Sequence, residues 1–402
     1  MNDYIFSGLK VLDVGTVVAG PVAATILADF GADVIKIEQP GEGDLLRVLS
    51  DIPTTPDADS NYFWQMDGRN KKDLTLNLKT PEGIEILHKL IADCDVYVTN
   101  QPFGVRRALK LSYDDIKPLN PSMIYASLSA FGEEGPERDS KGFDLLAYWA
   151  RSGLMDLVRS PGCKPSQALP GMGDHPTAIA LYASIVTALL NKERTGKGAM
   201  VHTSLLANGL WSAASIAAGA LANGDMDAYR ATNQVPAATG YVYATKDNRW
   251  LQLTMIRSEG QFLQFLDSID QLHFIKDERF TTPELWYENR EQLSALIQNV
   301  LINREAAEWL AIFEAKMVPI ELVATVDEAV RNEQLIINNM VVAPTDPDID
   351  VPFIINHPIK ISNLDQVGPK RAPELGEHTD EILQNLGYSH QQILALKDKG
   401  VT

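Results

Sequence analysis

Cysteine is scarce in this chain of 402 residues, which has only Cys94 and Cys163. Two cysteines are too few for a disulfide framework or a cysteine-ligated metal cluster, so neither can organise the fold. Long apolar runs are missing as well, because no uncharged stretch approaches the roughly 20 residues that a bilayer-spanning helix needs. The Ala-rich segment 210–222 is too short for that purpose. The sequence therefore predicts a protein without membrane spans.

Positive charge is in the minority. The chain has 35 Lys and Arg against 53 Asp and Glu, which gives a net charge of −18 at pH 7. This balance argues against nucleic acid or an anionic membrane as the main partner, but it leaves room for a local basic site. Residues 1–4 lack the basic-then-apolar layout of a signal peptide, so we expect a cytoplasmic protein.

A phosphate-binding glycine loop is absent from the first predicted βαβ unit. This unit has a strand at 10–15, a helix at 19–30 and a second strand at 32–38. Glu38 near the end of the second strand suggests a nicotinamide dinucleotide site. However, Gly15 and Gly20 are five residues apart, so the G-x-G-x-x-G motif is not there. The pattern disfavours a dehydrogenase.

The length and the order of elements predict two domains in an α/β protein. Strands and helices alternate to about residue 205, which indicates a doubly wound, Rossmann-like large domain. The order of elements then changes to a hairpin at 240–245 and 249–254 followed by helices. This order indicates a smaller α+β domain. Strands predicted at 340–342, 352–355 and 359–361 rejoin the large domain, which is therefore discontinuous. We expect a large domain over 1–210 and 335–402, a small domain over 225–330, and linkers at 211–224 and 331–334.

The densest basic cluster of the N-terminal half contains Arg69, Lys71 and Lys72. Such a loop can be a solvated face. In an acidic protein, three cations on one turn can also hold a nucleotide phosphate. Both interpretations remain open from the sequence.

The stretch 170–177 combines two glycines, an aspartate and the start of a helix. Gly171 and Gly173 allow positive φ or close approach of a ligand, and a helical pattern opens at Pro176. Asp174 is thus expected on a tight turn beside a helix N-terminus, where N–H groups favour negative charge. It can be a nucleophile there, or simply an N-cap or turn residue.

Taken together, these stretches resemble the family III CoA-transferases (the CaiB/BaiF group), which include formyl-CoA:oxalate and carnitine CoA-transferases. The matching runs follow one another in order over nearly the whole chain. They are Gly8–Asp13, Ala19–Pro21, Leu27–Glu38, Gly43-Asp44 with Arg47, Asn70–Lys72, Leu76–Gly83, Ser152-Gly153, Gly173-Asp174, Thr195–Gly198, Ser204–Leu206 and Gly376–Thr379.

The resemblance implies an enzyme that moves CoA from an acyl-CoA thioester to a carboxylic acid, without a metal or redox cofactor. Asp174 occupies the place of the family's covalent nucleophile. It would form a mixed anhydride and then an aspartyl-CoA thioester, which passes CoA to the acceptor acid. Backbone N–H groups beside Asp174 are the expected stabilisers of the oxyanions, and water must stay out.

The resemblance also implies that coenzyme A lies along the strand ends of the large domain. Positions that match the family's CoA contacts are Val17, Val18, Ala19, Leu76, Lys79, Asn100 and Lys141. The alternative for Val17 and Leu76 is ordinary strand packing, and Lys79 and Lys141 can equally be surface lysines.

Several positions depart from the family pattern. Gln39 stands where members often place an arginine. The family arginine in the loop after Asn100 aligns with Ala108, and we expect Arg106 to substitute for it. The glycine-rich lid of some members is absent, because the corresponding region 232–240 has one glycine.

Two alternatives remain beside the transferase. Racemases of the family resemble this chain but carry a His before the aspartate that aligns with Asp144, where this chain has Phe143. A two-base racemase therefore lacks a base, and His175 is interpreted as a helix-start residue. Asp144 itself is either structural or part of the pocket. The alternative of another class is a non-catalytic CoA-binding protein.

The acid substrate and the assembly are the remaining expectations. The motif Tyr148–Gly153 resembles the branch that acts on 2-hydroxy acids with aryl or branched side chains. Arg47 or Arg151 could instead bind a second carboxylate and favour a dicarboxylic acid. Family members are intertwined homodimers, and the long crossings near 205–235 and 325–345 are compatible with that arrangement.

Overall fold

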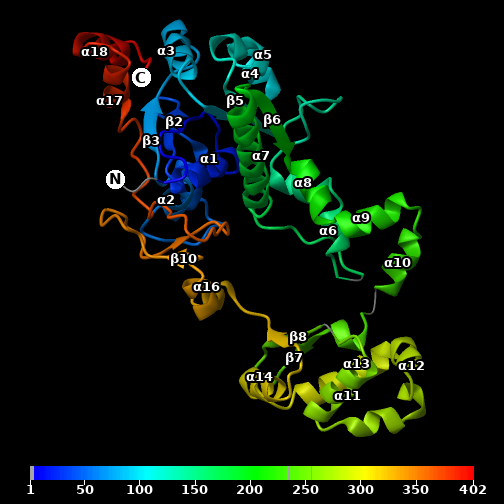
Figure 1. The fold of residues 1–402 in the computed structure, drawn as a ribbon. Helices are drawn as coiled ribbons and strands as arrows, with labels where there is room; N and C mark the ends of the chain where they lie inside the picture. The colour runs from blue at the N-terminus through cyan, green and yellow to red at the C-terminus, as the bar shows by residue number, and fades with distance from the viewer. Residues whose placement is uncertain (1–3, 161, 234–235, 255) are drawn as a thin grey trace. The chain divides into compact units, whose positions relative to one another are not determined.

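The computed structural model describes residues 4–160, 162–233, 236–254 and 256–402. The chain divides into two compact units (Figure 1). Unit 1 comprises Met1–Val158, Pro165–Ala217 and Gln334–Thr402, and unit 2 comprises Arg159–Lys164 and Ala218–Glu333. The expectation of a cytoplasmic protein is based on residues 1–4, of which residues 1–3 lie outside the described part. It stays a prediction. Among the described residues, no helix is both long and apolar enough to cross a bilayer.

Unit 1 is built on a six-stranded sheet in which every neighbouring pair is parallel. Its strands are β1 (Lys10–Asp13), β2 (Asp33–Glu38), β3 (Lys72–Thr75), β4 (Val96–Thr99), β5 (Ile124–Ser129) and β6 (Ala199–Ser204). Their order is β3-β2-β1-β4-β5-β6, the order of doubly wound dinucleotide-binding folds. The predicted parallel α/β sheet is confirmed. The order reverses between β1 and β4, where ligands of such sheets bind.

Helices cover both faces of this sheet. They are α1 (Ala19–Asp29), α2 (Tyr62–Asp67), α3 (Pro81–Ile91), α4 (Phe103–Leu109), α5 (Tyr113–Ile116), α6 (Leu154–Leu157), α7 (Asp174–Thr195), α8 (Leu205–Ser212), α17 (Thr379–Asn385) and α18 (His390–Asp398). Side chains alternate along β4: Val96 and Val98 pack with α1 and α7, whereas Tyr97 packs with α3. Thr80 caps α3, and Pro81 is its first residue, a position where the fixed φ of proline suits a helix.

The C-terminal segment belongs to the core of unit 1. Ala372 joins one hydrophobic cluster and Leu383 the other, and the Trp64 indole donates to the carbonyl of Pro373 at 2.9 Å. Two short strands, β10 (Val341–Val342) and β11 (Ile354–Ile355), pair antiparallel here. The strand expected at 359–361 is wrong, because the backbone of Ile359 bonds to the side chains of His357 and Gln366 instead of to a neighbouring strand.

Unit 2 has its own sheet and its own core. The strands β7 (Val242–Ala244), β8 (Trp250–Leu253) and β9 (Ile320–Leu322) form an antiparallel sheet, which includes the predicted hairpin. The helices are α10 (Met226–Thr232), α11 (Glu259–Ser268), α12 (Pro283–Glu288), α13 (Arg290–Leu301), α14 (Ala306–Ala315) and α15 (Val326–Ala329). Phe262, Phe265 and Phe313 are fully buried at its centre. Two further helices, α9 (Ala214–Leu221) and α16 (Glu333–Ile337), contain the unit boundaries.

Candidate active site

A cavity of about 420 Å³ opens at the carboxyl ends of the parallel strands of unit 1. The loop after β1, the loop after β4 and the start of α7 all contribute to its wall. Asp174 lines the cavity together with six of the positions expected to contact CoA. These are Val17, Val18, Ala19, Asn100, Arg106 and Lys141. The fold thus brings Val17 and Asp174, which are 157 positions apart in sequence, to the wall of one cavity.

Leu76 and Lys79 do not line this cavity. The Leu76 side chain is buried in the core beside Ile86 and Leu87 of α3, so it packs as an ordinary residue beyond β3. Lys79 is exposed, in the turn that leads into α3. A contact of either residue with CoA stays a prediction.

Asp174 is the first residue of α7, and two glycines shape the turn before it. Gly171 has φ +87°, a left-handed conformation that suits glycine. A Cβ at Gly173 would lie 2.6 Å from the Tyr148 ring, so only glycine fits there. The N-cap is Gly173, and no side chain caps the helix. Asp174 is therefore not an N-cap, and its carboxylate accepts no hydrogen bond from the described residues.

Asp144 fixes the backbone of this turn through hydrogen bonds. It is 3% exposed, and its Oδ2 accepts hydrogen bonds from the N–H groups of Gly171 at 2.8 Å and Gly173 at 3.2 Å. Its Oδ1 accepts from the N–H of Leu145 at 2.8 Å. Of the two interpretations of Asp144, the structure supports the structural one, because the carboxylate fixes the backbone that carries Asp174.

The surroundings of Asp174 disfavour its charge. Burial, together with the carboxylates of Asp144 and Asp67, raises the pKa of Asp174 to about 7, although the charge of His175 opposes this shift. Burial lowers the pKa of His175, but hydrogen bonding to Asp67 outweighs this and the pKa reaches about 9. The His175 Nδ1 lies 3.1 Å from the Gly171 carbonyl oxygen and the Nε2 lies 3.4 Å from Asp67 Oδ1. The ring is thus a held cation at neutral pH, not a free base.

The backbone N–H groups beside Asp174 are already used, which corrects their expected role. Those of Asp174 and His175 both bond to the carbonyl of Gly171, and that of Thr177 bonds to Gly173. The N–H of Gly173 bonds to Asp144, and Pro176 has none. The first N–H groups of a helix have no partner within the helix, but here they donate to the turn that precedes α7 and are therefore not open to an oxyanion.

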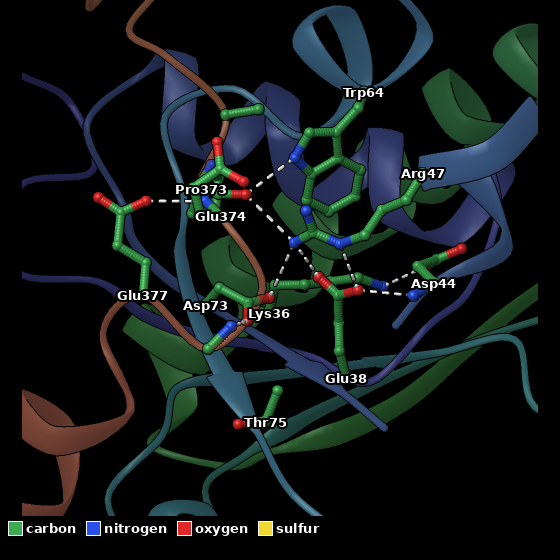
Figure 2. A network of polar contacts seen from close by, with 12 residues as sticks. Lys36, Glu38, Asp44, Arg47, Trp64, Asp73, Thr75, Pro373, Glu374 and Glu377 are labelled. Atoms are coloured by element: carbon green, nitrogen blue, oxygen red, sulfur yellow. Dashed lines mark hydrogen bonds and ion pairs between the residues drawn. The ribbon is translucent and has the colours of Figure 1, made fainter. Parts of the chain in front are cut away.

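The loop after β1 is held in a strained conformation by a buried ion pair. Val17 has φ +64°, which is rare for a β-branched residue. Its N–H bonds to Asp44 Oδ1 at 2.8 Å, and Asp44 in turn pairs with Lys36 at 2.7 Å. Lys36 also donates to the carbonyl of Gly15. Figure 2 shows Lys36 and Asp44 in a network that continues to Glu38.

Sequence reasoning missed Lys36, although one signal marks it. Lys36 stands between Ile35 and Ile37 in the middle of β2, where a buried charge has to be paired. Burial opposes its charge, but the carboxylates of Asp13, Asp44 and Glu38 raise the pKa of Lys36 above its ordinary value. The amine therefore stays charged and anchors the wall of the cavity.

The basic cluster around residue 70 is not a simple solvated face, because its cations are paired with carboxylates. Arg69 pairs with Asp29 at 2.5 Å and Lys71 pairs with Asp13 at 2.9 Å, and both side chains are nearly inaccessible. Lys72 lies 3.3 Å from Glu381. Arg69 and Lys71 thus hold the sheet to its surroundings. Lys71 and Lys72 also line a separate cavity of about 390 Å³, so a phosphate there stays a prediction.

The two arginines considered for a second carboxylate are also engaged. Arg47 donates to both oxygens of Glu38, at 2.9 and 2.7 Å, and lies over the Trp64 ring (Figure 2). Arg151 donates to both oxygens of Glu137 at 3.0 Å. Neither residue lines the cavity that contains Asp174. In the described part of the chain, no group of three or more His, Cys, Asp or Glu residues is arranged to hold a metal ion.

Comparison with known proteins adds to this geometry. The sequence matches CoA-transferase family III over residues 6–379. It is 32% identical to (R)-2-hydroxy-4-methylpentanoate CoA-transferase of Clostridioides difficile, with 99% of each chain covered. It is 28% identical to cinnamoyl-CoA:phenyllactate CoA-transferase of Clostridium sporogenes over 100% of this chain and 98% of that protein. The fold is similar to the crystal structure of a CAIB/BAIF family protein from Brucella suis, with TM-score 0.80, 28% identity, and coverage of 96% of this chain and 100% of that one.

Proposed function

This chain belongs to CoA-transferase family III and acts on acyl-CoA and a carboxylate, and we propose that it transfers CoA through covalent intermediates on Asp174. The observation that supports this most directly is the position of Asp174. Its carboxylate accepts no hydrogen bond from the described residues and lines the cavity at the strand ends. A weakly solvated carboxylate of this kind is a stronger nucleophile than one in water.

The proposed reaction has four steps. The Asp174 carboxylate attacks the thioester carbonyl, and the C–S bond breaks to give an acyl-aspartyl anhydride and CoA thiolate. The thiolate then attacks the aspartyl carbonyl and releases the donor acid, which leaves an aspartyl-CoA thioester. The acceptor carboxylate attacks the aspartyl carbonyl of this thioester and expels CoA thiolate, which leaves a second mixed anhydride. The thiolate then attacks the acceptor's acyl carbonyl in that anhydride, which gives the new CoA ester and restores the Asp174 carboxylate. No proton, metal or oxidant is consumed.

The oxyanions of these steps need donors other than the N–H groups beside Asp174. We propose the N-terminus of α1, because Val18 and Ala19 line the same cavity and no side chain caps this helix. Its dipole and its open N–H groups favour negative charge. The cation of His175, next to Asp174, adds to the same field.

We propose a 2-hydroxy acid with an apolar side chain as the acceptor. The cavity wall includes Val17, Leu45, Phe143 and Leu205, which suit such a side chain. A dicarboxylic acid is less well supported, because Arg47 and Arg151, the two arginines considered for its second carboxylate, are paired with Glu38 and Glu137 and lie outside the cavity lining. The two relatives named above act on 2-hydroxy-4-methylpentanoate and phenyllactate, which have this chemistry.

Replacement of Asp174 by alanine tests the proposal. We expect D174A to lose transfer from acyl-CoA donors to 2-hydroxy acids by at least about 1,000-fold, because no other group can form the anhydride. The rate is read by mass spectrometry of the CoA esters, and hydroxylamine during turnover should modify Asp174 of the wild type. Replacement of the exposed Asp114 by alanine is the matched control. An unchanged rate in D174A would contradict the proposal.

The same assays separate the alternatives. A racemase would exchange the α-proton of its acyl-CoA in deuterated water without an acceptor acid. The residue at the position of the family's racemase base is Phe143, which argues against this activity. A non-catalytic CoA-binding protein would bind CoA but exchange acyl groups with no acid.

We also propose that the protein is a homodimer, in line with the family resemblance. Helix α9 has no buried residue, and Leu221 on α9 and Trp211 on α8 are 86% and 77% exposed. Large apolar side chains this exposed are typical of surfaces that another chain covers. Light scattering coupled to gel filtration tests the proposal, and a mass of one chain would contradict it.

A further inference from the structure

Arg106, the arginine expected to contact CoA, is already engaged with another residue. Its Nη2 and Nη1 donate to the two carboxylate oxygens of Glu133 at 2.8 and 3.2 Å, and Nη1 also donates to Ser127 at 3.1 Å. The side chain of Arg106 is almost fully buried. A phosphate would have to displace Glu133 from this bidentate pair, and the buried carboxylate would then be left without its partner.

Arg138, on the loop after β5, has the opposite character. It lines the same cavity, and its guanidinium carbon lies 3.5 Å from the centre of the Phe103 ring. Its Nε is enclosed without a partner, and in the part of the chain that the structure describes its guanidinium forms no ion pair. The ring of Phe103 thus supports the face of the guanidinium, and none of the described carboxylates forms an ion pair with it.

Three guanidinium groups lie close to the Phe103 ring. Arg106, Arg107 and Arg138 lie 5.5, 5.6 and 3.5 Å from its centre. Glu133 compensates one of these charges, that of Arg106. Lys141 adds a further cation to the cavity wall. In a chain with a net charge of −18, this excess of positive charge at the strand ends attracts an anion.

We propose that Arg138, fixed on the face of Phe103, is the guanidinium that binds a phosphate group of CoA, and that Lys141 is the second cation of this subsite. The inference rests on the proposed function. A stacked guanidinium keeps its N–H donors in the plane of the group, directed away from the ring, and this edge matches two phosphate oxygens. The Arg106–Glu133 pair is then a fixed part of the wall.

Binding of three ligands to Arg138→Gln tests the assignment. The ligands are CoA, dephospho-CoA and pantetheine, measured by calorimetry with the full chain. We expect R138Q to weaken CoA binding on the order of 10- to 100-fold, as for the loss of a charge-assisted hydrogen bond. Pantetheine has no phosphate, so its affinity should not change. A loss with CoA but not with dephospho-CoA would assign the 3′-phosphate, and an equal loss with both would assign the diphosphate.

Two further variants complete the test. R138K keeps the charge but not the planar fork, and we expect CoA affinity between those of the wild type and R138Q. Lys117→Gln removes a cation that lies over the Tyr113 ring outside the cavity, and it should bind CoA as the wild type does. Wild-type affinity of R138Q for CoA, or an equal loss for pantetheine, would overturn the assignment. These affinities do not depend on turnover, so an absence of transfer in the wild type would count against the proposed function alone.

Discussion

At the scale of single residues, the ionised carboxylate of Asp174 lowers the stability of the fold, and its proposed role as nucleophile explains why it is there. Burial and the nearby carboxylates disfavour the ionised form, which the proposed attack requires. A raised pKa in the folded state means that folding stability falls as pH rises from the ordinary 3.8 through about 7, because the unfolded chain ionises first. The catalytic group therefore destabilises the fold at the pH where it is active.

We expect Asp174→Asn to be more stable than the wild type at pH 8, on the order of 2 kcal/mol after allowance for partial exposure. The difference should shrink towards pH 5, since Asp174 is then protonated in the folded wild type. Urea unfolding at both pH values measures it. A difference that stays the same at the two pH values would show that Asp174 is not titrating as described.

Asp144 is a positioning residue, and its effect should appear in turnover and not in CoA binding. Asparagine has one oxygen, so Asp144→Asn places an NH₂ group against the Gly171 and Gly173 N–H groups or against that of Leu145. The turn should shift, and displacement of a reacting group by about 1 Å can cost on the order of 100-fold in rate. We expect kcat to fall with the Kd of CoA unchanged, and a raised Kd with normal kcat would contradict this role.

At the scale of elements, the loop after β1 shows how a buried ion pair maintains strain. The Asp44 carboxylate, which pairs with Lys36, accepts a hydrogen bond from the N–H of Val17. A left-handed conformation costs about 1–2 kcal/mol for a residue with a Cβ. Val18 and Ala19 follow directly, so this strain sets the point where α1 begins at the cavity.

Two substitutions of Val17 separate strain from side-chain packing. Val17→Ala removes the packing but keeps the strain, whereas Val17→Gly removes both. We therefore expect V17G to be more stable than V17A by about 1 kcal/mol, the reverse of the usual order of Ala and Gly. Thermal unfolding of the two variants measures this. A more stable V17A would show that the loop is not held in the left-handed region.

At the scale of the whole molecule, the two units differ in which segments of the chain supply their hydrophobic cores. The core of unit 2 comes from residues 238–320 alone. The two cores of unit 1 also need Ala372, Ile382, Leu383, Ile393, Leu396 and Val401 from the far end of the sequence. Unit 1 therefore cannot complete its core until the last residues are present.

This difference predicts the behaviour of fragments. A fragment of residues 218–333 should unfold cooperatively in urea, because it contains all core residues of unit 2. A fragment of residues 1–217 should lack a cooperative transition, since one face of its sheet loses the packing of α17 and α18. Circular dichroism during urea titration checks both. A cooperative 1–217 fragment as stable as the full chain would contradict this account.

The sequence by itself determined the features that depend on neighbours along the chain. Apolar runs of four to six residues and helical periodicity predicted the parallel sheet, and the Gly-Asp pair at 173–174 and the motifs around it predicted the family. Local backbone geometry follows from local residues, as at Gly171, where a positive φ needs glycine. That information is already present before folding.

Only the tertiary structure decided which charges meet. Arg69 pairs with Asp29, 40 positions away, and Arg106 pairs with Glu133, 27 positions away. No local pattern specifies such partners. Arg69 and Arg106 looked available for a ligand but are paired with carboxylates in the fold, whereas Arg138 forms no ion pair with the described residues. The N–H groups beside Asp174 likewise looked available but are bonded within the fold. Most buried polar groups find a hydrogen-bond partner when the chain folds. Which donors and acceptors remain free for a ligand is therefore decided by the tertiary structure.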